Sequence, residues 1–145
     1  MTPPLPNPAA ELSEALEALA DLLRGERAPD RFDVRALFLP LGALILEGDL
    51  AGLALTLEHL GAATGGQPEA WAKAVREELD LATDEFCLAV DPRYLKLPNY
   101  DMAYTLASRE QLACRLQAAE HLGFELPPGA EERIATADAD LEPYL

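Results

Sequence analysis

Four acidic residues are spaced so that they share helix faces in two predicted helices. Glu14 and Glu17 lie three residues apart in one helix, and Glu77 and Asp80 lie three residues apart in another. Carboxylate pairs at this spacing on facing helices could hold Mg²⁺ or Mn²⁺, because hard cations prefer several oxygen ligands. The other interpretation is a solvated acidic face, since basic residues are interleaved with the second pair at helical spacing.

The two carboxylate pairs resemble in type those of all-α nucleotide pyrophosphohydrolases of the MazG kind. The resemblance implies a divalent-metal-dependent all-α hydrolase that acts on a nucleotide-like phosphate, with Glu14, Glu17, Glu77 and Asp80 as its site. In this chain the pairs lie farther apart than in that family. The sequence therefore leaves open whether the protein is an enzyme, and a non-enzymatic role is favoured.

Other motifs of metal or nucleophilic chemistry are missing from the sequence. The two histidines and two cysteines are far apart, with no Cys-x-x-Cys, His-x-x-x-His or Glu-x-x-His spacing. Gly65-Gly66 is a loop pair and not a phosphate-binding loop. We expect no nitrogen- or sulfur-ligated metal site and no cofactor.

The most unusual local composition lies between residues 93 and 104. This stretch holds three of the four tyrosines and two of the eleven basic residues. Tyr and Arg are common at interfaces because they bury a large area and keep a polar tip. A loop packed on a helical bundle would have the same composition. The predicted binding residues are Arg93, Tyr94, Lys96, Tyr100 and Tyr104.

The charge balance restricts the class of partner. Eleven Lys and Arg stand against 26 Asp and Glu, so the net charge is −15. Nucleic acids and anionic membranes attract basic surfaces, so neither is an expected ligand. A basic protein partner would be steered toward this chain, although the charge could also serve only solubility. The N-terminus has no Lys or Arg before Arg24 and no early apolar run, so we expect a cytoplasmic protein.

Composition and periodicity predict an all-α fold, a compact bundle of about five main helices plus a short C-terminal helix. The chain has 28 Leu and 26 Ala but few Val and Ile, and this composition favours helices over strands. The expected organisation is a flexible Pro-rich arm (1–8), a single helical domain (9–137) and an acidic tail (138–145). The predicted helices are 8–24 capped by Asn7, 31–47 with a break at Pro40, 50–60 ending at Gly61, 68–91, 99–122 capped by Asn99, and a short one from 130.

The apolar stripes of these helices predict both a core and a self-association surface. Spare apolar surface on helix 99–122 predicts a homodimer formed through Tyr100, Tyr104, Leu112 and Leu122. The expected core residues are Leu16, Leu37, Phe38, Leu41, Ile45, Leu57, Trp71, Leu79, Phe86 and Leu106.

The favoured function is a non-enzymatic, acidic helical protein-interaction module of adaptor or regulatory type, of the kind found in bacteria. Its partner is a protein, possibly a basic one. One alternative is the hydrolase described above. The other is a small-ligand pocket between helices 68–91 and 99–122.

Overall fold

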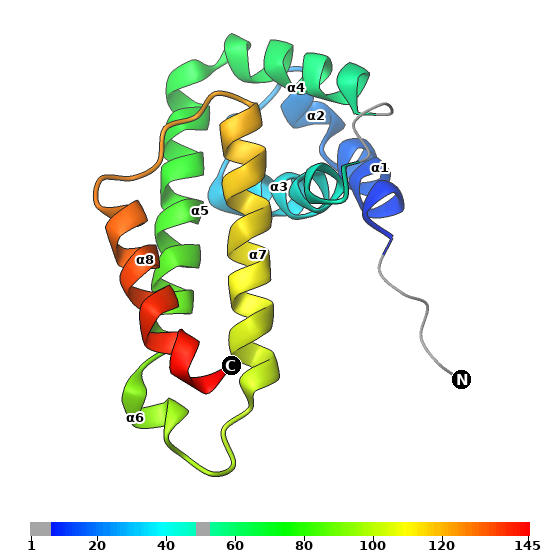
Figure 1. Cartoon of the computed structure of the whole chain (residues 1–145). Helices are drawn as coiled ribbons and strands as arrows, with labels where there is room; N and C mark the ends of the chain where they lie inside the picture. Colours follow the sequence, from blue (N-terminus) through cyan, green and yellow to red (C-terminus); the bar gives the residue numbers. More distant parts are fainter. Residues whose placement is uncertain (1–6, 49–52) are drawn as a thin grey trace.

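The computed structural model describes residues 7–48 and 53–145, and the regular secondary structure of this part of the chain consists of helices without strands, as predicted (Figure 1). The N-terminal arm before Asn7 and the predicted start of the helix at residue 50 lie outside the described residues. The helices are α1 (Pro8–Ala18), α2 (Ala20–Leu23), α3 (Arg31–Leu46), α4 (Ala54–Gly66), α5 (Pro68–Ala89), α6 (Pro92–Leu95), α7 (Met102–His121), α8 (Ala130–Leu141) and the 3₁₀ turn η1 (Glu142–Tyr144).

The predicted helix 8–24 is divided into α1 and α2. Asn7 caps α1 as expected, because its Oδ1 accepts hydrogen bonds from the N–H groups of Ala9 and Ala10. The division falls at Leu19, whose φ of −108° is not helical. Two residues later the Asp21 carboxylate accepts the N–H of Leu22, a local bond that competes with the helical ladder.

Helix α3 is continuous, so the expected break at Pro40 is wrong. It begins with a capping box between Asp30 and Asp33 and runs through Pro40 to Leu46. Pro40 removes one backbone hydrogen bond, but α3 is buried along most of its length between α1, α5 and α7. Packing against these neighbours maintains the helix through Pro40.

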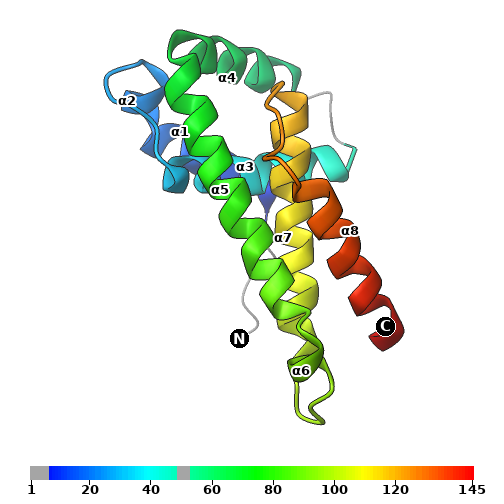
Figure 2. The same ribbon diagram turned by 90° about the vertical axis from the view of Figure 1, so that its left-hand side faces the viewer.

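Helices α3 and α7 cross at Gly42, where their backbones come very close to each other. A Cβ atom placed on Gly42 would lie 1.8 Å from the carbonyl oxygen of Cys114, well inside van der Waals contact. Only glycine therefore permits this crossing (Figures 1 and 2). The two helices approach through backbone rather than through interleaved large side chains.

Helix α4 does not end where the sequence predicted. It continues through Gly61 to Gly66, so residues 61–66 are helix and not loop. The buried Leu60 and Thr64 attach this turn to the core, and the Thr64 hydroxyl donates to the Gly61 carbonyl. Tertiary packing thus outweighs the low helix propensity of glycine.

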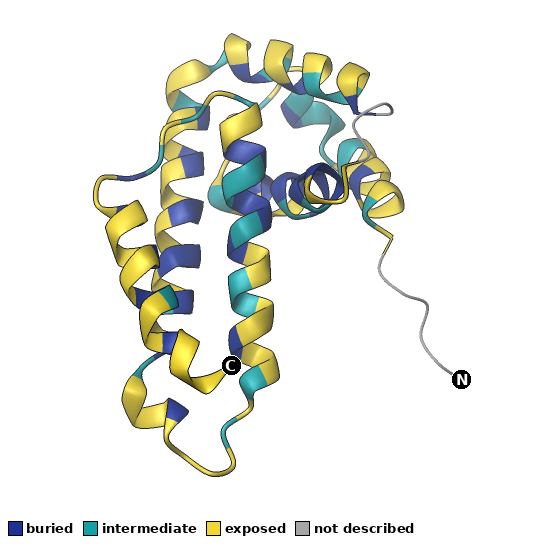
Figure 3. Cartoon of the chain, in the orientation of Figure 1, coloured by how far each residue is buried: buried dark blue, intermediate teal, exposed yellow. Residues whose placement is uncertain are grey.

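Helices α5 and α7 form the long axis of the molecule, and α8 packs against α5. Figure 3 shows the buried residues of α5 as a stripe along one side of the helix. The predicted connection 91–99 contains α6, and Asp101 rather than Asn99 caps α7. Helix α8 and η1 continue through the predicted acidic tail, where Leu141 is buried.

Most of the expected core residues are buried. On α7, however, the residue that faces the core is Thr105, one position before the expected Leu106. Leu106 is 45% exposed, whereas Leu112, expected at a dimer interface, is fully buried. Thr105 occupies the inner position because its hydroxyl donates to the Ala89 carbonyl. Leu16 and Leu57 are half-buried. The expected residues that are buried are Leu37, Phe38, Leu41, Ile45, Trp71, Leu79 and Phe86.

Within the described residues, none of the helices combines the length and the hydropathy that crossing a membrane requires. The apolar stretch that begins at Ala36 belongs to α3, which is buried along most of its length.

Candidate functional site

The four carboxylates of the predicted metal site lie on two helices that do not face each other. Glu14 and Glu17 are exposed on α1, and Glu77 and Asp80 are exposed on α5. Figure 1 shows α1 and α5 on opposite sides of α7. In the two described ranges, 7–48 and 53–145, no three His, Cys, Asp or Glu side chains are placed to hold a metal ion. The structure therefore does not assemble the site that the MazG resemblance implies.

The predicted binding residues 93–104 do lie together, at the end of the molecule formed by α6 and the first turn of α7. Two of them have local structural roles. Arg93 forms a forked ion pair with Asp91, which also caps α6. This exposed pair holds the pKa of Asp91 below its usual range through the side-chain and backbone hydrogen bonds of Arg93.

Tyr100 is part of the framework of this end. Its hydroxyl lies 2.6 Å from the Ala89 carbonyl and 2.6 Å from the Thr105 hydroxyl. Thr105 in turn donates to the same carbonyl. These bonds tie the end of α5 to the start of α7, so Tyr100 positions the loop more than it offers a contact surface.

Tyr94, Leu97 and Tyr104 are the side chains of this end that remain available for contact. Their exposed fractions are 49%, 54% and 58%, high values for such large side chains. Leu97 and Tyr104 line a hollow of about 600 Å³ together with Pro98, Asn99, Tyr100 and Asp101. Lys96 is also exposed beside them. We call Tyr94, Leu97 and Tyr104 the apolar end.

A buried ion pair in the centre of the molecule was not foreseen from the sequence. Arg115 Nε on α7 lies 3.0 Å from Glu78 Oε1 on α5, and both side chains are at most 3% exposed. Arg31 on α3 reaches Glu78 Oε2 at 3.9 Å. The available signal was the spacing, because Glu78 follows Trp71 by seven residues on the predicted apolar stripe.

Burial controls the electrostatics of this pair. It raises the pKa of Glu78 against the opposing attraction of Arg115, Arg35 and Arg31, and it lowers the pKa of Arg115. Among the described residues, Glu78 Oε2 and Arg115 Nε have no hydrogen-bond partner. The contact is thus a close ion pair with poorly aligned donors, a costly arrangement inside a core.

One of the two cysteines, Cys114, lies in an environment that lowers thiol reactivity. Cys87 is partly buried and Cys114 is buried, and both are free. Burial raises the pKa of the Cys114 thiol, which keeps it protonated and weakly nucleophilic.

The small-ligand alternative placed a pocket between the helices now identified as α5 and α7. The facing surfaces of these helices are filled by core side chains, including Phe86 and Leu112. A hollow of about 680 Å³ lies instead between α7 and α8.

Comparison with known proteins finds no family model, no curated protein and no solved structure that matches this chain.

Proposed function

We propose that the protein is a non-enzymatic interaction module that binds a protein partner through the apolar end. The observation that carries the proposal is the exposure of Tyr94, Leu97 and Tyr104 at one end of the molecule, where Leu97 and Tyr104 line a hollow, in a chain with few aromatic residues. Aromatic side chains that are rigidly presented and half-exposed are typical anchors of protein interfaces. The framework bonds of Tyr100 hold this surface in place before any partner arrives.

The net charge of the chain as a whole favours a basic partner. The net charge of −15 attracts a positively charged protein and accelerates the encounter. The apolar end then supplies the short-range contact. The hydrolase alternative has no supporting geometry, because its four carboxylates are not brought together.

Site-specific photocrosslinking in the cells that produce the protein tests this proposal. A photoreactive phenylalanine analogue replaces Tyr104, and in a control it replaces Leu55, which is 64% exposed on α4. We expect a defined adduct from position 104 that position 55 does not give. If both positions crosslinked to the same protein, this result would contradict the proposal.

Affinity measurements with the identified partner complete the test. The double substitution Tyr94→Ala/Tyr104→Ala should weaken binding by about thirtyfold or more, the effect of losing one interface hot spot. Leu55→Ala should leave it unchanged. An unchanged affinity of the double variant, with native circular dichroism, would refute the role of the apolar end. An adduct with a second copy of the chain would identify the expected homodimer instead.

A further inference from the structure

A groove between α7 and α8 is a second surface with its own chemistry. Helix α8 packs against α5, where Arg133 pairs with Asp84, and it is inclined to α7 (Figure 2). One ion pair, Arg109 to Asp138, connects α7 with α8. The hollow of about 680 Å³ between the helices is within the range of ligand-binding sites. Its lining residues are Leu116, Gln117, Glu120, Gly123, Phe124, Leu126, Glu131, Ile134, Ala135 and Asp138.

The floor of this groove is apolar and rigid. Leu116, Phe124 and Leu126 are half-buried, and each packs on the central core while keeping part of its surface in the groove. The Phe124 ring lies 6.2 Å from the ring of Phe38 in α3. The floor is therefore fixed by the core and does not depend on a ligand for its shape.

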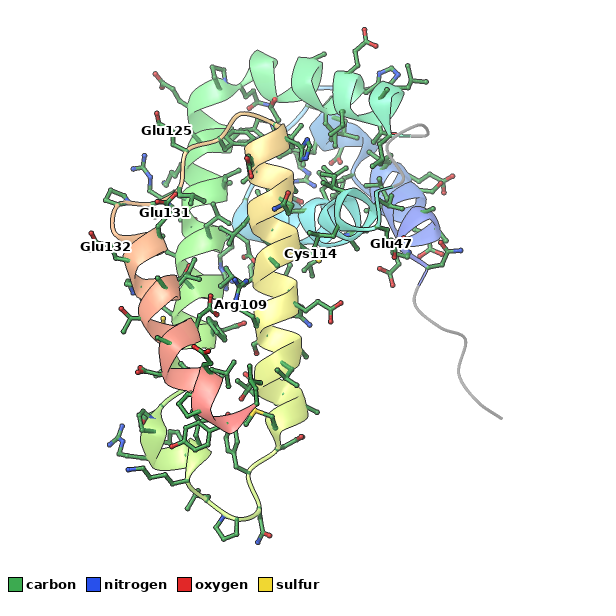
Figure 4. The ribbon with its side chains drawn as sticks, in the orientation of Figure 1. Glu47, Arg109, Cys114, Glu125, Glu131 and Glu132 are labelled. Atoms are coloured by element: carbon green, nitrogen blue, oxygen red, sulfur yellow. The ribbon has the colours of Figure 1, made fainter. Side chains whose placement is uncertain are left out.

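The rim of the groove is acidic. Glu120 on the last turn of α7 and Glu131 on the first turn of α8 are exposed and line the hollow. Figure 4 shows Glu125 in the connection between α7 and α8, and Glu131 at the start of α8. Among the residues that the structure describes, Glu120 and Glu131 form no salt bridge, whereas the charge of Asp138 is balanced by Arg109.

We propose that this groove binds an amphipathic peptide segment of a basic partner, with large apolar side chains on the floor and Lys or Arg at Glu120 and Glu131. Charge complementarity selects this occupant, because an apolar floor between unneutralised carboxylates disfavours neutral and acidic segments. An open groove between two inclined helices suits a helix or extended peptide. The surface is separate from the apolar end, since Tyr104 and Glu120 are on opposite ends of α7, about 24 Å apart.

Defined peptides test the chemistry. Three short fluorescent peptides share the same Leu and Phe anchors and carry flanking Lys, Gln or Glu. By fluorescence anisotropy at low ionic strength, the Lys peptide should bind about tenfold more tightly than the Gln peptide, and the difference should shrink as salt screens the charges. Equal affinities of the three peptides would overturn the proposal.

Paired variants locate the site. Ala135 is exposed and lines the groove, so Ala135→Trp should fill it and abolish binding of the Lys peptide. Thr136 lines a hollow on the α5 side of the same helix, so Thr136→Trp is the matched control and should bind normally. Loss of binding in both variants, or in neither, would refute the groove as the site.

Two double variants that remove the same charge separate contacts at the rim from the effect of the overall negative charge. Glu120→Gln/Glu131→Gln should weaken the Lys peptide by about three- to tenfold. Glu14→Gln/Glu17→Gln on α1 removes the same charge and should change affinity much less. If both double variants weakened binding of the Lys peptide equally, the rim would act only as part of a general acidic surface, and the proposal would be overturned. Binding that is lost on Tyr104→Ala but not on Ala135→Trp would overturn it too, while supporting the apolar end.

Discussion

The Glu78–Arg115 pair makes a sharp prediction about stability. At an effective dielectric constant of about 20, unit charges 3.0 Å apart attract each other by about 5.5 kcal/mol. Removing both ions from water costs several kcal/mol for each, so the pair as a whole contributes little net stability. Removing one partner leaves the other as a buried, uncompensated charge. Each single substitution, Glu78→Leu or Arg115→Met, should therefore destabilise the protein by about 3–5 kcal/mol.

The double variant Glu78→Leu/Arg115→Met should be less destabilised than either single variant. It replaces two buried charges with apolar side chains of similar volume, an exchange that is often neutral or stabilising. Urea unfolding followed by circular dichroism at pH 7 measures the free energy of unfolding of the wild type, both single variants and the double variant. Arg93→Met in the exposed pair with Asp91 is the control and should cost less than about 1 kcal/mol. If the double variant lost as much stability as the two single variants together, this result would refute the reasoning.

The two single variants should also differ in their response to pH. In Arg115→Met the remaining Glu78 has a folded-state pKa raised by burial, so the folded state gains protons more readily than the unfolded state. Its destabilisation should shrink as pH falls from 7 toward 5. In Glu78→Leu the remaining Arg115 stays charged throughout this range, so the free energy of unfolding of this variant should lack that gain at low pH. Parallel pH profiles of the two variants would contradict the assignment of burial as the cause.

Three further predictions concern the helix crossing, the α3 cap and self-association. Gly42→Ala should destabilise the fold by about 1–3 kcal/mol or more, because its Cβ meets the Cys114 carbonyl. Gly61→Ala, where a Cβ meets nothing, should stabilise it by about 0.5–1 kcal/mol, and thermal unfolding compares the two. Burial raises the pKa of Asp33, but its Arg27 ion pair and backbone hydrogen bond outweigh this and hold the pKa below 3.8. Asp33→Asn should therefore cost stability near neutral pH, and this cost should fade as acid titration passes below pH 3.8. Light scattering after size exclusion tests the homodimer hypothesis: twice the 15.7 kDa chain mass, halved by Tyr104→Glu, would assign the apolar end to a second copy of the chain, and a monomer mass at micromolar concentration would end the hypothesis.

The helices predicted best from the sequence are those in which local signals and packing agree. Helix α5 begins at Pro68 with Glu69 in its first turn, and its apolar stripe faces the core as expected. In α4 the signals disagree, because Gly61 predicts an end while Leu60 and Thr64 are attached to the core. Packing determines the outcome there, and a single sequence contains no direct record of it.

The candidate surfaces were predictable only in part, for a related reason. The composition of residues 93–104 pointed to this part of the chain, but it did not include Leu97 and did not separate the exposed Tyr104 from Tyr100, whose hydroxyl is hydrogen-bonded to the Ala89 carbonyl. The α7–α8 groove depends on the inclination of α8, which is set by its packing on α5. Such an angle arises from three-dimensional contacts and leaves no periodic pattern in either helix.

Helix α7 connects every feature on which the proposals depend. Its first turn carries Tyr104, its middle contains Arg115 and the crossing at Gly42, and its last turn carries Glu120. A helix that is fixed at its centre by a close backbone crossing and a buried ion pair cannot rotate or slide without breaking both. The surfaces at its two ends are therefore held at a constant separation. This rigidity favours recognition by preformed surfaces over recognition by folding on contact, because the entropic cost of ordering has been met before a partner binds.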